Sequence, residues 1–445
     1  MARISVSVLI FCLFLASLNA RDLQQESGNR ESVKELIPKA EKGDAESEFQ
    51  LGLSYARGVG AVQNYAEAVR WFTKAAVQGH SEAQCFLGAC YAFGHGVSND
   101  DFEAVRWYRK AAGQGNPNAQ YYLGVHYGSA RGVAKNDIEA AKWYRKAAEQ
   151  GNSPAQWNLG LCYALGRGEE SNSVEAVKWF LKAAEQGNAD AQNNLGACYG
   201  LGSGVTKDDA EAISWYRKAA EQGNVTAQIN LAGCYVSGIG VSKDEVEAAK
   251  WYRKAADQGS AQGQYYLGAC YRSGGGVNKS EAEAVEWYRK SAGQGYVLAQ
   301  DELGLCFEFG KGVRADDAEA AKWFREAADH GYPNAQNNLG GFYERGRGVA
   351  KDDAEAVVWY RKAADQGYAP AQNNLGLCYQ SGRGVVMDQV EAYKWLKLSA
   401  EQGTAEAVVT LRNLEMRITK AQITEGQRRS QEFKPRQLFN SESYP

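Results

Sequence analysis

This sequence has little net charge and few histidines, and each shortage excludes a class of function. Its 50 basic and 53 acidic residues leave a net charge of −3. That is too little to gather a phosphate backbone, so we expect no nucleic-acid partner. The four histidines, His80, His95, His126 and His330, are scattered, and no two have metal-ligand spacing. Since no singular cluster interrupts the pattern of the chain, we expect no metal, no cofactor and no catalytic residue.

Long apolar runs are also missing, except near the N-terminus. Arg3 precedes an almost wholly apolar segment from Val6 to Leu18, and Ala20 is a plausible cleavage point. This segment is too short to cross a bilayer of about 30 Å as a helix, so residues 1–20 are interpreted as a secretory signal peptide. The polar composition of residues 21–30 predicts a linker. We therefore expect an exported protein, periplasmic or secreted, that does not span a membrane and is either free or associated with the cell envelope.

The chain does contain a tryptophan every 36 residues. Ten positions follow this period: Trp71, Trp107, Trp143, Trp179, Trp215, Trp251, Trp287, Trp323, Trp359 and Trp395. A period of this length is the signature of a solenoid, in which each unit packs chiefly on its neighbours. We predict an all-α solenoid of about ten helix-turn-helix repeats over residues 44–403. A capping helix is expected at 31–43, capping helices at 404–432 and a disordered tail at 433–445.

Each repeat is predicted to form two helices, which we call helix A and helix B. In the third copy, helix A begins near Ala119, and helix B starts at Asn136 after a glycine-containing turn. Every helix B start has a capping residue with Glu three positions later, which predicts a capping box. The caps are Asn64, Asp100, Asn136, Asn172, Asp208, Asp244, Ser280, Asp316, Asp352 and Asp388. Adjacent aspartates here and the Gly-x-Gly turns are therefore interpreted as structural, not as calcium or phosphate sites.

Four elements recur together: Leu-Gly-x-x-Tyr in helix A, a Gly-x-Gly-Val turn, Glu-Ala-x-x-Trp-Tyr-x-Lys-Ala-Ala in helix B, and a closing Gln-Gly. Together they resemble the Sel1-like repeats of the tetratricopeptide-repeat-like superfamily, over about residues 44–403. Departures are local: Ala232 replaces the helix A glycine, and Glu169 replaces the turn valine. The resemblance implies a right-handed superhelix of paired helices that serves as a scaffold or adaptor for proteins and is not an enzyme.

Cysteine occupies one helix A position in most repeats. These residues are Cys90, Cys162, Cys198, Cys234, Cys270, Cys306 and Cys378. Equivalent helices of successive repeats lie at least about 8 Å apart, whereas a disulfide needs Cα atoms within about 7 Å, so we expect buried, reduced thiols. Cysteine-rich exported members of the family carry two cysteines per repeat. The penicillin-binding or β-lactamase behaviour suggested for them, as a cell-envelope enzyme or wall-ligand binder, is therefore the weaker alternative.

In the related tetratricopeptide superhelix, helix A lines the concave groove. The position two before the helix A leucine varies between repeats, from aromatic in the N-terminal half to Asn in the C-terminal half: Phe49, Cys85, Tyr121, Trp157, Asn193, Ile229, Tyr265, Asp301, Asn337 and Asn373. Adjoining residues extend it: Tyr122, Asn194, Tyr266, Asn338, Asn374, Arg272, Glu308 and Glu344. Aromatics supply anchoring area, and Asn can bond a peptide backbone. We predict a protein or peptide partner in this groove, with an inert surface or a structural spacer as alternatives.

Overall fold

The computed structural model describes residues 32–436 and divides into two compact units, Met1–Gln222 and Gly223–Pro445. All 23 elements within the described residues are helices. None of these helices is both long and apolar enough to cross a membrane. The predicted signal peptide at 1–20, the linker at 21–30 and the tail residues 437–445 lie outside the described range.

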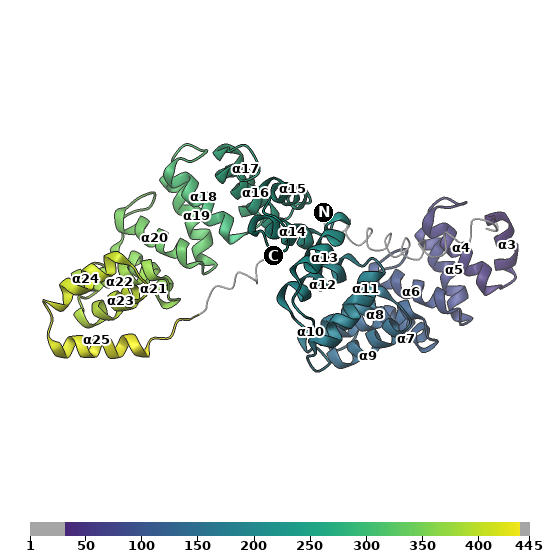
Figure 1. Cartoon of the computed structure of the whole chain (residues 1–445). Coiled ribbons are helices and arrows are strands. Elements are labelled where there is room, and N and C mark those ends of the chain that lie inside the picture. Colours follow the sequence, from purple (N-terminus) through teal and green to yellow (C-terminus); the bar gives the residue numbers. More distant parts are fainter. Residues whose placement is uncertain (1–31, 437–445) are drawn as a thin grey trace. The chain divides into compact units, whose positions relative to one another are not determined.

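The first unit contains one single helix followed by five helix pairs (Figure 1). Its helices are α3 (Val33–Glu41), α4 (Ala45–Arg57), α5 (Tyr65–Val77), α6 (Ser81–Phe93), α7 (Asp101–Gly113), α8 (Pro117–Ser129), α9 (Asp137–Glu149), α10 (Ser153–Leu165), α11 (Ser173–Glu185), α12 (Ala189–Leu201) and α13 (Asp209–Glu221). Within this unit, each pair of consecutive helices, from α3 and α4 to α12 and α13, packs together. This nearest-neighbour packing is the arrangement of an α-solenoid.

The second unit contains five further pairs and two terminal helices. They are α14 (Val225–Ser237), α15 (Glu245–Asp257), α16 (Ala261–Ser273), α17 (Glu281–Ala292), α18 (Val297–Phe309), α19 (Asp317–Asp329), α20 (Pro333–Arg345), α21 (Asp353–Asp365), α22 (Ala369–Ser381), α23 (Gln389–Glu401), α24 (Ala405–Glu415) and α25 (Lys420–Glu432). Both α24 and α25 pack on α23. The predicted all-α solenoid of 36-residue repeats is confirmed.

Close approach of the two helices explains the helix A glycine. A Cβ placed on Gly124 in α8 would lie 2.5 Å from the ring of Tyr144 in α9, so only glycine allows this contact. Leu123 and Ala147 beside it are fully buried. The recurring tryptophans contribute to the same core; Trp395, for example, is 1% exposed. Their interpretation as packing residues agrees with this burial.

Of the two hydrogen bonds that make up the predicted capping box, only one forms at the start of each helix B. The cap side chain does accept from the third backbone N–H, as Asn136 does from Glu139 at 3.0 Å. The return bond from the glutamate is not formed at any of the ten helix B starts, all of which are described. The cap N–H instead donates to a helix A carbonyl, as Asn136 N does to Tyr127 O at 3.0 Å. Glu139 is thereby free to pair with Lys142 at 2.8 Å.

A ladder of glutamines joins successive repeats. The last glutamine of helix B donates from Nε2 to Oε1 of a buried helix A glutamine, at 2.7 to 2.9 Å. The pairs are Gln114–Gln84, Gln150–Gln120, Gln186–Gln156, Gln222–Gln192, Gln258–Gln228, Gln294–Gln264, Gln366–Gln336 and Gln402–Gln372. His330 stands where the next rung should be, and Oε1 of Gln300 is consequently buried without a partner among the described residues.

Restoring this rung should stabilise the protein. We expect His330→Gln to raise the free energy of unfolding by about 1 kcal/mol, because the new amide can donate to the buried Gln300 oxygen. Chemical denaturation followed by circular dichroism measures the effect. Gln366→His is the matched control and should lower stability by a similar amount. Equal stability of both variants and the wild type would contradict a contribution from the ladder.

The C-terminal packing extends beyond the predicted boundary at residue 433. Phe433 lies edge-on against Trp395, with ring centroids 5.3 Å apart. The backbone N–H of Arg436 donates to the Asp365 carbonyl at 2.8 Å. Residues 433–436, which the sequence assigned to a disordered tail, are therefore attached to α21 and α23.

Candidate functional site

In the first unit, the predicted groove tyrosines also bridge helices. Tyr121 and Tyr122 in α8 are half-buried. Tyr122 stacks on Tyr108 of α7, with centroids 5.2 Å apart and an interplanar angle of 16°. The ring centroids of Tyr121 and Tyr144 of α9 are 6.1 Å apart. Burial raises the pKa of both groove tyrosines. These rings therefore combine a partly exposed edge with a packing role.

Three further predicted groove residues of this unit are on the next two A helices. Trp157 in α10 is half-buried and packs against the cluster that contains Phe180 and Leu195. Asn193 and Asn194 in α12 are also half-buried. Each of the three thus presents part of its side chain to the surface.

In the second unit, Tyr265 and Tyr266 of α16 repeat this arrangement. Tyr266 stacks on Tyr252 of α15, with centroids 5.0 Å apart. The ring of Tyr265 contacts that of Tyr296, which precedes α18, with the two centroids 5.3 Å apart. The predicted aromatic groove residues of both units are therefore also contacts between successive helices.

Three of the four charged residues predicted for the groove are already paired. Each forms an ion pair with a neighbouring repeat: Arg272 with Glu302, Glu308 with Arg347 at 2.7 Å, and Glu344 with Arg383. Such pairs neutralise one another and fix the relative position of repeats. They are therefore less available to a partner than the sequence suggested.

The predicted asparagines of the second unit lie on α20 and α22. Asn374 Nδ2 donates to Asn337 Oδ1 at 2.9 Å, so one pair links the two helices. Asn338 is half-buried. Asn373 is 8% exposed, and its Oδ1 has no hydrogen-bond partner among the described residues. We call Asn337, Asn338, Asn373 and Asn374 the amide row. At least one of its hydrogen-bond acceptors, the Asn373 oxygen, is not used by the described residues.

Asp301 in α18 is next to this amide row. Its side chain is almost fully buried, with 3% of the residue exposed. Asn334 Nδ2 donates to its Oδ2 at 2.8 Å, and the Asn338 amide is close enough to lower the pKa of the carboxyl group. Oδ1 has no hydrogen-bond partner among the described residues. Asn334 Oδ1 in turn accepts from the Tyr368 hydroxyl at 2.8 Å, so the network joins α18, α20 and the start of α22.

Burial dominates the electrostatics of this cluster. The pKa of Asp301 is raised to about 7, chiefly by burial; the amides of Asn334 and Asn338 lower it, and the nearby charges of Glu302 and Glu308 contribute to the rise. Burial and the Asp301 charge raise the pKa of Tyr332 to about 12. The same two causes raise the pKa of Tyr368. The tyrosines therefore remain neutral at physiological pH, whereas Asp301 titrates there.

Three tyrosines, two of which lie near Asp301, replace helix caps. Every A helix from α4 to α16 has a preceding side chain that accepts a backbone N–H. At α18, α20 and α22 the cap residues are Tyr296, Tyr332 and Tyr368, which make no side-chain cap bond. Losing a cap costs about 1 kcal/mol. The sequence reasoning missed these residues, although the change from Asn to Tyr after the closing glycine is visible in it.

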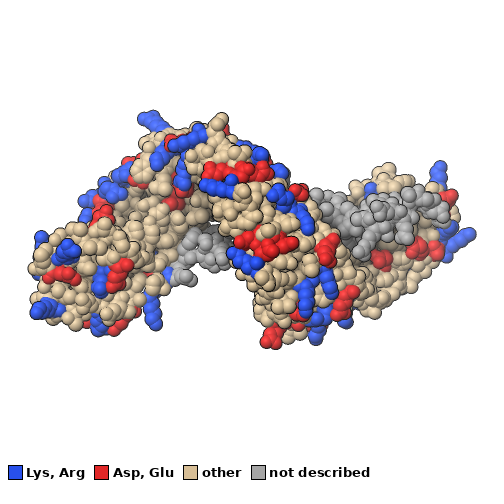
Figure 2. All heavy atoms as spheres, viewed as in Figure 1, with Lys and Arg blue, Asp and Glu red and all other residues tan. Residues whose placement is uncertain are grey.

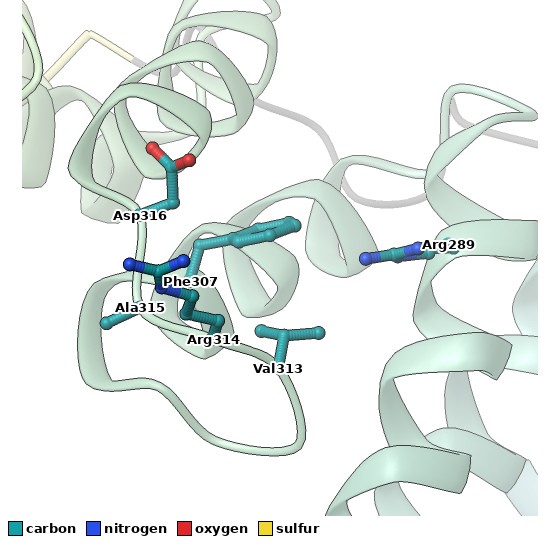
Figure 3. A pocket seen from close by; sticks show the side chains of 6 residues that line it. All are labelled: Arg289, Phe307, Val313, Arg314, Ala315 and Asp316. Atoms are coloured by element: carbon teal, nitrogen blue, oxygen red, sulfur yellow. The ribbon is translucent and has the colours of Figure 1, made fainter.

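We considered two other kinds of site. A pocket of about 550 Å³ is lined by Arg289, Phe307, Val313, Arg314, Ala315 and Asp316. In Figure 3, Arg289 projects toward the ring of Phe307, 5.6 Å from its centroid. Asp316 is engaged as the cap of α19. Among the six lining residues, none has a hydroxyl or thiol nucleophile.

None of the eight described cysteines forms a disulfide. Burial raises the pKa of Cys90 to about 12 and is the main cause that raises that of Cys162 to about 11, which disfavours the reactive thiolate. His126 is buried, and its Nδ1 lies 2.9 Å from the Arg131 carbonyl oxygen. Within the described residues, no three potential ligands are grouped to hold a metal ion.

Comparison with a protein family gives a match over most of the chain. The model of the Sel1 repeat matches ten consecutive segments, residues 45–80, 81–116, 117–152, 153–188, 189–224, 225–260, 261–296, 297–332, 333–368 and 369–404. No curated protein matches the sequence.

Two solved structures are similar to this chain over most of their own length. One is a protective antigen present in uropathogenic Escherichia coli strains, which displays the Sel1-like repeat fold. It is 35% identical, the match covers 91% of this chain and 94% of that one, and the TM-score is 0.59. The other is a Sel1 repeat protein from Oxalobacter formigenes. It is 33% identical, with coverages of 71% and 93% and a TM-score of 0.55.

Proposed function

The chain belongs to the Sel1-repeat family, whose members generally mediate protein–protein interaction, and we propose that it is an exported, non-catalytic scaffold. It binds an extended segment of a partner protein along the faces formed by its A helices. The observation that carries this proposal is the amide row of α20 and α22, where the buried Asn373 oxygen lacks a partner among the described residues. A peptide backbone offers the N–H donor that such an oxygen accepts.

The partly exposed aromatic residues support the same function. Tyr121 and Trp157 offer rigid ring area at a small cost in side-chain entropy, which is typical of binding anchors. Surface charge offers no competing explanation. On the face shown in Figure 2, basic and acidic residues are interspersed, without a large patch of either sign.

Export rests on the N-terminal sequence. The apolar segment Val6–Leu18 after Arg3 favours a cleaved signal peptide. The similar E. coli protein is named a protective antigen. That supports an exported location for this chain too. The described cysteines form no disulfides, so they give no support to the cysteine-rich envelope enzyme as an alternative.

The test is affinity capture from an envelope extract with residues 21–445 as bait. We expect the triple variant Tyr121→Ala, Trp157→Ala, Asn193→Ala to retain specific partners at least about tenfold less well, because anchor residues contribute most of the binding energy. Quantitative mass spectrometry of the captured proteins measures the loss.

A matched control removes exposed apolar groups from B helices of the same unit: Phe102→Ala, Ile138→Ala and Val174→Ala. These side chains are 76%, 59% and 52% exposed, so their loss should change capture little. Circular dichroism of both triple variants checks that the fold is retained. Partners that survive the first variant, or are lost equally with the second, would argue against an A-helix binding face.

A further inference from the structure

The carboxyl group of Asp301 differs from its acidic neighbours in having no cation. Each neighbouring carboxylate on the A helices has an arginine: Glu302 has Arg272, Glu308 has Arg347 and Glu344 has Arg383. Among the described residues, no lysine, arginine or histidine pairs with Asp301. The cluster therefore carries one uncompensated carboxyl group, which is also the most buried of the four.

Leaving this group unpaired costs free energy. A buried polar atom without a partner is unfavourable, and an ionised carboxylate in the same place is more so. Oδ2 is held by Asn334, but Oδ1 is left over. A positively charged donor would both form a hydrogen bond with Oδ1 and neutralise the negative charge of the Asp301 carboxylate.

The surroundings suit the side chain of a basic residue. Tyr332, Tyr368 and Asn334 are half-buried, so one side of the cluster reaches the surface. Aromatic rings attract a cation through their faces, and their apolar parts can pack against its alkyl stem. The helix caps that Tyr332 and Tyr368 replace are present in the A helices from α4 to α16, and such a local loss of a stabilising feature is typical of positions where binding takes precedence over stability.

We propose that Asp301, with Tyr332 and Tyr368, forms a subsite for a lysine or arginine side chain of the bound partner segment. This inference rests on the proposed function, because the subsite lies on the A-helix face that receives the segment. Asp301 accepts a charge-assisted hydrogen bond, and the two tyrosines flank the stem of the basic side chain. The subsite selects the positive charge, whereas the amide row binds the backbone irrespective of sequence.

Pooled peptides can test this without knowledge of the natural partner. The probes are nonapeptide pools, randomised at eight positions, with a central Lys, Arg, acetyl-lysine or citrulline. They are applied at pH 8 to the immobilised chain of residues 21–445. We expect the wild type to retain the Lys and Arg pools about tenfold better than the two neutral pools. In Asp301→Asn this ratio should fall to about one, with retention of the neutral pools unchanged.

The control and the outcomes separate this inference from the proposed function. Asp329→Asn removes the same charge from the exposed end of α19 and should keep the wild-type ratio. Equal retention of charged and neutral pools by the wild type, or the same ratio in Asp301→Asn, would overturn the subsite and leave the binding face standing. An equal fall in Asp329→Asn would show general charge attraction and overturn it too. Retention of no pool at all would overturn both proposals.

Discussion

Gly132→Ala is expected to lower the free energy of unfolding of the first unit by about 3 to 5 kcal/mol. Gly132 is in the turn between α8 and α9, with φ +64°, and a Cβ there would lie 2.1 Å from the Asp101 carbonyl oxygen at the start of α7. The turn would have to withdraw from the preceding repeat. Arg131, which binds both carboxylate oxygens of Asp101, would be displaced with it.

Gly115→Ala is the matched control for this effect. Gly115 also has a left-handed backbone, with φ +92°, but a Cβ there meets no atom within 4 Å. Only backbone strain of about 1 kcal/mol is therefore expected. Chemical denaturation measures both variants, and hydrogen exchange of α7 and α8 locates the damage. A loss of stability no larger at Gly132 than at Gly115 would contradict the inter-repeat contact as its cause.

Asp301→Asn is expected to become more stable relative to the wild type as pH rises. The folded pKa of about 7 lies above the ordinary value of 3.8. Between these values the folded state holds a proton that the unfolded state has released, so wild-type stability falls as pH increases. That stability is fully present below pH 4 and is lost as pH rises through 7. Asparagine does not titrate, so the difference in unfolding free energy should grow by about 2 to 3 kcal/mol from pH 5 to pH 8.

Denaturation of both proteins at several pH values measures this difference. Comparison with the wild type at each pH cancels the titration of the other groups. Asp329→Asn serves again as the control, because it makes the same substitution at an exposed position. A flat difference for Asp301→Asn would mean that the Asp301 carboxyl is not desolvated in the folded protein.

Much of the fold could be predicted from the sequence, because its signals are local and repeated. Helix B was expected to start at Asn136, which is the observed cap of α9. The closing glycines, such as Gly115, have the left-handed backbone that their position indicated. The candidate site was harder. Asn337 and Asn374 were named separately, but their hydrogen bond joins residues of different repeats. No periodicity within one repeat predicts such a bond.

The sequence by itself determined the repeat, because a fixed period, caps and glycine stops act over a few residues of one chain segment. Only the tertiary structure decided how polar groups are shared between segments. In the folded chain, the Asn136 backbone N–H donates its hydrogen bond to the Tyr127 carbonyl and not to the Glu139 side chain. The tertiary structure paired Arg272, and it buried Asp301 beside Asn334 without a cation among the described residues. The physical reason is that desolvation and long-range hydrogen bonding depend on which repeat faces a side chain. That follows from the packing of whole helices and cannot be read from the residue's own neighbours in sequence.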